Sequence, residues 1–160
     1  MRFLSKAKTL LQLQGVLATA NIASITSFTL GDWRAEQTLC LDQVKEQMGN
    51  AKFIVRSSCG REDNNASSNA GAFSSVLNVT FENLEGAIEE VFSSYDIVDL
   101  QDEVLAQPML EGVVRSGVAL SHDPNTGTPY RIINWTEGSD TTSVTGGLGG
   151  SIWQSAAGIV

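Results

Sequence analysis

The sequence predicts a mixed α+β fold whose strands pair mainly antiparallel, on three observations. Stretches with helical spacing of apolar residues alternate with short runs rich in β-branched residues. Two apolar runs, residues 116–122 and 129–135, flank the turn sequence DPNTGT, which indicates a β-hairpin. The elements do not follow a regular strand–helix–strand alternation, which argues against a purely parallel sheet. With 160 residues, 42% of them hydrophobic, the chain suits one domain or one lobe of a larger one.

The first 20 residues have an amphipathic pattern. Residues 5–14 are expected to form a helix with Ser5 as its N-cap. Early positive charge and the ending Ala18-Thr19-Ala20 also resemble a secretory signal. Gln12 and Gln14 interrupt the apolar middle, which favours a helix that belongs to the fold.

The next three elements follow from β-branched content and from helical spacing. IASITSFT, residues 22–29, predicts a strand. Asp32 is expected to cap a helix with apolar residues at helical spacing, namely Trp33, Leu41, Val44 and Met48. KFIVR, residues 52–56, predicts a short buried strand.

The second half of the chain continues the mixed pattern. SVLNV, residues 75–79, is expected to be extended, and Thr80 to cap a helix running to about Tyr95. One face of that helix collects the apolar residues Leu84, Ala87, Ile88, Val91 and Tyr95. EVLAQPML, residues 103–110, predicts a strand in which Pro108 indicates an edge position or a bulge. The Gly-rich tail, SVTGGLGGSIWQSAAGIV, is assigned no element.

Charge and residue counts exclude several classes of function. The formal net charge of -8 repels phosphate backbones, so we expect no nucleic-acid partner. No apolar run approaches the ~20 residues that span a bilayer, and we interpret the chain as cytoplasmic with no membrane partner. Cys40 and Cys59 specify neither a disulfide framework nor a metal site. His122 is the only histidine, which argues against a Cys/His zinc site.

The stretch FIVRSSCGREDNNASSNAGAFSSVLNV, residues 53–79, combines features of an anion site. Arg56 would stand at the end of a buried strand, where a guanidinium can contact phosphate oxygens through two hydrogen bonds. Ser57 and Ser58 add hydroxyl donors, and the small residues around Gly71 allow a close backbone approach. The alternative is that Arg56 pairs with an acidic residue of the loop, Glu62 or Asp63, and spacing alone favours that alternative. The stretch matches neither common phosphate-loop pattern.

The same stretch resembles the V-R-S-S-x-x-x-E-D-x-x-x-x-S-x-A-G-x-x-x-S/T-x-L-N-V signature of the phosphoenolpyruvate synthase and pyruvate, phosphate dikinase family. VLAQPMLEGVVRSGVALSHDPNTG, residues 104–127, is similar to the family's V-L-V-Q-x-M…S-G-V-x-F-T-x-D-P-x-T-G segment. KAKTL, residues 6–10, is similar to the family's G-G-K-x-x-x-L helix, although the paired glycines are absent. The resemblance spans roughly residues 3–150, and its motifs follow one another in the family's order.

This resemblance implies an ATP-grasp nucleotide-binding domain, in which two α+β lobes clamp ATP. Residues 1–160 would form a partial domain: an N-terminal lobe with a phosphate-clamp loop over about 1–100, and an incomplete second lobe with the hairpin over about 101–160. Carried over residue by residue, Lys6 and Arg56 match contacts to the ATP phosphates. Gly71 and Ser75 match the small-residue loop over the nucleotide, and Gln107 matches a glutamine beside the adenine and ribose.

The resemblance also implies which parts of the family's enzymes lie elsewhere. Mg²⁺ would be held by ligands outside this chain, and the phosphohistidine domain and the domain that binds phosphoenolpyruvate or pyruvate are missing. We therefore assign no catalytic residue, give His122 no catalytic part, and interpret Cys59 as a buried, inert thiol. The implied function is the ATP-binding part of a dikinase-type phosphotransferase, a kinase-like transferase with an unknown acceptor, inactive by itself. The alternative is a non-catalytic nucleotide-sensing or partner-binding module that retains the lobe.

Overall fold

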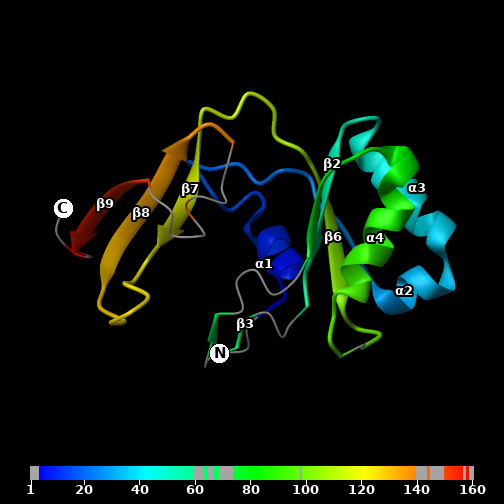
Figure 1. Ribbon diagram of the computed structural model, residues 1–160, viewed down its shortest axis with the longest axis horizontal. Helices are drawn as coiled ribbons and strands as arrows, with labels where there is room; N and C mark the ends of the chain where they lie inside the picture. The colour runs from blue at the N-terminus through cyan, green and yellow to red at the C-terminus, as the bar shows by residue number, and fades with distance from the viewer. Residues whose placement is uncertain are drawn as a thin grey trace. The chain divides into compact units, whose positions relative to one another are not determined.

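The computed structural model describes residues 4–59, 63–64, 67–68, 74–97, 99–139, 144, 150–156 and 158. The chain divides into two compact units, Met1–Met109 and Leu110–Val160, which we call unit 1 and unit 2. Every strand pairing that the structure describes is antiparallel, in unit 1 and in unit 2 alike. Helices and antiparallel sheets together confirm the α+β class (Figure 1).

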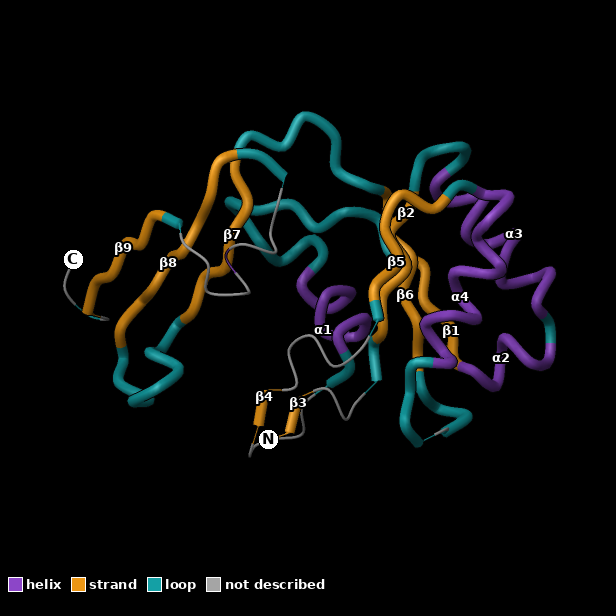
Figure 2. Tube along the Cα trace, in the orientation of Figure 1, coloured by secondary structure: helices purple, strands orange, loops and turns teal. Residues whose placement is uncertain are grey.

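Unit 1 contains a four-stranded sheet in the order β1-β6-β2-β5. Its elements, in chain order, are α1 (Lys6–Leu13), β1 (Thr26–Thr29), α2 (Leu30–Ala35), α3 (Gln37–Met48), β2 (Phe53–Ser57), β3 (Asp63–Asn64), β4 (Ser67–Ser68), β5 (Ser75–Val79), the 3₁₀ turn η1 (Phe81–Asn83), α4 (Leu84–Ser93) and β6 (Glu103–Pro108). β3 and β4 pair with each other as a separate short ribbon. Figure 2 shows α2, α3 and α4 on one side of the four-stranded sheet and α1 on the other.

Two clusters of buried side chains match these two sides. Alternate strand residues such as Phe53, Val55 and Val104 enter the large cluster together with the inner faces of α2, α3 and α4. On the opposite side Leu105 packs with Ala7 of α1 in a much smaller cluster. The sheet therefore has a well-covered helical face and a second face on which α1 covers only a part.

The strand expected over residues 22–29 begins later, at Thr26. Ile25, just before it, is buried in the small cluster, and Ile22 packs against that cluster from outside. The β-branched content of this segment thus serves packing against α1 as well as pairing in the sheet.

The prediction of a single helix capped by Asp32 is wrong in two respects. The helix begins earlier, after Thr29, and the segment forms two helices, α2 and α3, instead of one. Thr29 is the N-cap of α2, and it exchanges two hydrogen bonds with Asp32 as a capping box: Thr29 N donates to Asp32 Oδ2 over 2.9 Å, and Asp32 N donates to Thr29 Oγ1 over 3.0 Å. Glu36, with φ −148° and ψ 69°, leaves the helical conformation and separates α2 from α3.

The apolar face expected after residue 80 is confirmed, because all five of its residues are buried. The start differs in detail: Thr80 precedes the 3₁₀ turn η1 and its side chain makes no capping hydrogen bond to the backbone. α4 itself begins at Leu84 and ends at Ser93, so Tyr95 lies just beyond its end.

β6 corrects the expectation of an edge strand. It lies between β1 and β2 and belongs to unit 1. Pro108 is its last residue and pairs with Phe53 of β2, while the pairing with β1 stops at Ala106. The missing N–H of proline is tolerated because that end of β6 has a strand on one side only.

Unit 2 is a three-stranded meander of β7 (Arg115–Leu120), β8 (Tyr130–Glu137) and β9 (Ser151–Ala156). The expected hairpin is β7–β8, and Asp123 closes its turn by accepting hydrogen bonds from the backbone N–H groups of Asn125 and Thr126. β9 lies in the tail that was assigned no element. No helix among the described residues has the length and apolar character to cross a bilayer.

The capping box gives a test of α2. Replacing Thr29 by Ala should lower the free energy of unfolding by about 1 kcal/mol, as for other lost N-caps. Hydrogen bonds from Thr29 lower the pKa of Asp32 below its ordinary value of 3.8. A lowered folded-state pKa means that the ionised Asp32 stabilises the fold above pH 3.8 and that this contribution is lost as the pH falls through the folded-state pKa.

Chemical unfolding of the wild type, Thr29→Ala and Asp32→Asn at a series of pH values checks this expectation. The stability difference between wild type and Asp32→Asn should shrink at acid pH, and Asp42→Asn, an exposed change on α3, is the control. A difference that stays constant well below pH 3.8 would contradict the capping role of the ionised Asp32.

Candidate functional site

Four of the five residues proposed for a nucleotide site are described by the structure, and all four lie in unit 1. Lys6 is the first residue of α1, Arg56 lies in β2, Ser75 begins β5, and Gln107 lies in β6. The fifth, Gly71, lies outside the described residues. The side chain of Ser75 is exposed, and those of Lys6, Arg56 and Gln107 are half-buried.

The strand register brings Arg56, Ser75 and Gln107 to one face of the sheet. Arg56 stands directly opposite Ser75 of β5, and Gln107 stands opposite Ile54, two residues before Arg56 in β2. Directly opposed residues of an antiparallel pair share a face, and residues two apart in a strand share it too. These side chains therefore lie on the face opposite the one that enters the large core.

The same face carries α1, and we call it the α1 face. Leu105 of β6, which is the second cross-strand neighbour of Arg56, packs against Ala7 of α1. The neighbour of Ala7 in the helix, Lys6, directs its ammonium Nζ to the backbone oxygen of Ser57 over 3.1 Å. Because Ser57 follows Arg56 in β2, the ammonium of Lys6 contacts the strand one residue beyond Arg56.

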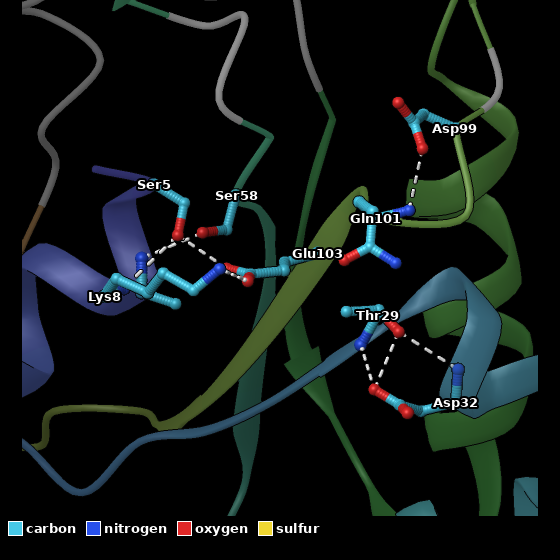
Figure 3. Close-up of polar contacts among 9 residues, drawn as sticks. Ser5, Lys8, Thr29, Asp32, Ser58, Asp99, Gln101 and Glu103 are labelled. Carbon is cyan, nitrogen blue, oxygen red and sulfur yellow. Dashed lines mark hydrogen bonds and ion pairs between the residues drawn. The ribbon is translucent and has the colours of Figure 1, made fainter. Parts of the chain in front are cut away.

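A network of polar contacts fixes α1 in this place (Figure 3). The carboxylate of Glu103, at the start of β6, accepts a hydrogen bond from Ser5 Oγ over 2.5 Å and forms an ion pair with Lys8 Nζ over 2.5 Å. The N–H of Ala7 donates to Ser58 Oγ over 2.8 Å. Since Glu103 is 6% exposed and Ser58 is fully buried, each needs these partners.

The backbone of Glu103 is held from the opposite side. Its carbonyl oxygen accepts hydrogen bonds from Tyr95 Oη over 2.6 Å and from the N–H of Ser58 over 2.9 Å. Tyr95 is itself buried against α4 as part of the large core. Glu103 therefore joins α1 to the rest of unit 1: its side chain contacts the start of α1, and its backbone contacts Tyr95 of the large core. We call this set of contacts the α1 junction.

The two serines after Arg56 differ from the expectation that their hydroxyls face a ligand. Ser57 continues the core-facing alternation of β2 and is 2% exposed. Ser58 is fully buried, and its hydroxyl oxygen accepts a hydrogen bond from the N–H of Ala7. The acidic residues expected as alternative partners of Arg56, namely Glu62 and the side chain of Asp63, lie outside the described residues.

Sequence reasoning missed Glu103 and Lys8. Residues 103–110 were predicted to form a strand, but the acidic residue that opens it was given no role. An acidic residue at the start of an otherwise apolar strand is a signal, because a buried carboxylate requires a partner. No comparable sequence signal identifies Lys8 or Ser5 as that partner, since both are about 100 positions away; Ser5 and Glu103 are separated by 98.

The thiols and the histidine take no part in this site. Cys40 and Cys59 are both buried and unlinked, and burial together with the negative charges of Asp32 and Glu36 raises the pKa of the Cys40 thiol. His122 lies in the exposed β7–β8 turn, where its Nδ1 is 3.1 Å from Ser121 Oγ. In the described part of the chain, no three His, Cys, Asp or Glu side chains gather as metal ligands.

A depression beside β5 and α4 offers an electrostatic contrast with the α1 face. Four glutamates contribute to its lining, namely Glu82, Glu85, Glu89 and Glu90. A concentration of like charge repels phosphate, so this depression is a poor place for an anion. The end of β2 instead carries two cations, Lys6 and Arg56.

No family model matches the chain, and no curated protein matches it. Among solved structures, the chain is similar to a dinucleotide-forming acetyl-coenzyme A synthetase 1 of Ca. Korarchaeum cryptofilum, solved in complex with coenzyme A, Ca-AMPCP and HgCl+. The TM-score is 0.53 at 12% identity, and the match covers 99% of this chain and 61% of that chain. The likeness supports an ATP-grasp-like fold and does not single out the phosphoenolpyruvate synthase family.

Ser58 provides a test of the α1 junction. Ser58→Ala leaves the buried N–H of Ala7 without its acceptor, and an unsatisfied buried donor costs about 1–3 kcal/mol. Ser75→Ala, at an exposed position on a neighbouring strand, is the matched control and should change the free energy of unfolding by less than about 0.5 kcal/mol. Urea unfolding of the three proteins measures both values. Equal stability of wild type and Ser58→Ala would show that this hydrogen bond does not hold α1.

Proposed function

We propose that the chain is the ATP-binding part of a dikinase-type phosphotransferase similar to phosphoenolpyruvate synthase, with Lys6 and Arg56 as contacts for the ATP phosphates. The observation that carries the proposal is the hydrogen bond from Lys6 Nζ to the backbone oxygen of Ser57, the residue that follows Arg56 at the end of β2. The ordered sequence motifs support it, and so does a structural neighbour that was solved with a nucleotide, Ca-AMPCP.

The two cations would have different tasks. The guanidinium of Arg56 has a planar fork of donors that can hold two phosphate oxygens at once. The ammonium of Lys6 has three donors, so it can keep its hydrogen bond to the carbonyl of Ser57 and still donate to a phosphate. Phosphoryl transfer depends mainly on positioning and on neutralising the phosphate charge, which such a pair supplies.

The remaining residues of the proposed site would surround the nucleotide. Ser75 stands opposite Arg56 and could donate its exposed hydroxyl to a phosphate oxygen. Gln107 would contact the adenine and ribose, and Gly71 would belong to the loop that closes over the phosphates. Mg²⁺ would neutralise phosphate charge and would be held by residues outside this chain. The acceptor of the phosphoryl group would also lie outside this chain.

The proposal predicts that Arg56 contributes most to ATP affinity. Arg56→Ala should weaken binding by roughly tenfold or more, because a charge-assisted bidentate contact is about twice as strong as a neutral hydrogen bond. Lys6→Ala should weaken binding less, and Arg56→Lys should fall between wild type and Arg56→Ala. Titration with labelled ATP in the presence of Mg²⁺ measures all three affinities.

Lys52→Ala is the matched control, because Lys52 is an exposed cation that immediately precedes the same strand. Its removal changes the net charge by one, as the other alanine variants do, at a position four residues before Arg56. Equal ATP affinity for wild type and Arg56→Ala would exclude the phosphate-contact role of Arg56. If Lys52→Ala lowers the ATP affinity as much as Arg56→Ala does, the loss is explained by net charge and not by a specific contact of Arg56.

A further inference from the structure

We propose that Glu103 is a positioning residue: its carboxylate holds the first turn of α1 against β6 and so determines where Lys6 stands beside Arg56. The part of this proposal that concerns ATP rests on the function proposed above. The part that concerns the placement of α1 does not.

The contacts of Glu103 enclose Lys6 along the helix. Ser5 lies immediately before Lys6 and donates to one carboxylate oxygen, and Lys8 lies two positions after it and pairs with the other oxygen. Between Lys6 and Lys8, the N–H of Ala7 donates to Ser58. The helix is therefore attached to the sheet on both sides of Lys6, by the side chains of Ser5 and Lys8 and by the N–H of Ala7, while the Lys6 side chain extends to the carbonyl of Ser57.

Apolar packing contributes comparatively little to the placement of α1. Ala7 is the one residue of the helix that is buried, and Leu10 is partly buried against the same small cluster. Leu11 and Leu13 are 42% and 37% exposed. An isolated helix of eight residues is marginal in water, so α1 depends on its contacts with the rest of unit 1. The strongest of these contacts are the charge-assisted ones to Glu103, whose removal leaves a poorly packed helix.

The charge of Glu103, and not only its shape, should matter. An ionised carboxylate only accepts hydrogen bonds, which matches a hydroxyl donor and an ammonium group at its two oxygens. Glutamine has nearly the same shape but presents an amide NH₂ in place of one oxygen. Glu103→Gln therefore keeps one acceptor and loses the ion pair with Lys8.

The placement of α1 is tested by the hydrogen exchange of the Ala7 amide, followed by NMR. In the wild type this amide should be protected, because its acceptor is a buried hydroxyl. In Glu103→Gln the Ala7 amide should exchange roughly tenfold faster than in the wild type. That factor corresponds to the loss of about one charge-assisted contact. Lys8→Met should act in the same direction from a 60%-exposed position, so it remains informative if Glu103→Gln fails to fold.

The amides of α4 and the variant Lys52→Met serve as controls for this exchange experiment. In Glu103→Gln the amides of α4 should exchange at wild-type rates. In Lys52→Met the Ala7 amide should also exchange at the wild-type rate, since the Lys52 side chain is not among the partners of Glu103. An unprotected Ala7 amide in the wild type would overturn the proposal. So would an unchanged exchange rate in Lys8→Met together with Glu103→Gln.

ATP binding separates positioning from general stability. In ATP–Mg²⁺ titrations, Glu103→Gln should weaken binding, and adding Lys6→Ala to it should cost less affinity than Lys6→Ala costs in the wild type. Adding Arg56→Ala should cost the same in both backgrounds, because Arg56 is held by β2 and not by α1. Equal costs of Lys6→Ala in the two backgrounds would reject the positioning role. If the wild type binds no ATP, the proposed function fails, and the placement of α1 is still decided by the Ala7 amide.

Discussion

A carboxylate that becomes almost fully buried on folding must be met by donors, and in unit 1 those donors come from the other end of the unit's sequence. Glu103 opens β6, a strand inside the sheet, while its partners Ser5 and Lys8 lie at the start of α1. Leaving such a carboxylate without partners costs several kcal/mol, far more than an exposed ion pair contributes. The position of α1 is therefore constrained by the requirement to satisfy Glu103, and the small apolar cluster beneath the helix adds to a placement that the charges already specify.

The arrangement on the α1 face follows from that constraint. The sheet supplies Arg56, Ser75 and Gln107 by register alone, because alternation fixes the face on which each side chain stands. Lys6 is different: it reaches the end of β2 only because its helix is attached to the sheet. Arg56 stands on a strand of the sheet, whereas Lys6 stands on a helix held by Glu103. Changing the contacts of Glu103 can therefore move Lys6 without changing any residue that would contact a ligand.

Several elements of both units could be predicted from the sequence, because local patterns determine them. The helical spacing around Ile88 identified the buried face of α4, and the turn DPNTGT identified the β7–β8 hairpin. The break at Glu36 was missed because both flanking segments have good helical spacing, and β9 because its glycine-rich surroundings resemble a connection. For the site, sequence motifs named Lys6, Arg56, Ser75 and Gln107, but no local pattern reveals a pairing such as Ser5 with Glu103 across 98 positions.

The claim that the α1 face is the nucleotide-binding face is tested most directly by backbone amide shifts of the isotope-labelled chain during titration with ATP and Mg²⁺. The account predicts that the largest shifts cluster in the first turn of α1, at the end of β2 and at the start of β5, around Lys6, Arg56 and Ser75. Shifts centred on the acidic depression beside β5 and α4, or on the sheet of unit 2 alone, would contradict it. The absence of any shift at millimolar ATP would contradict it equally.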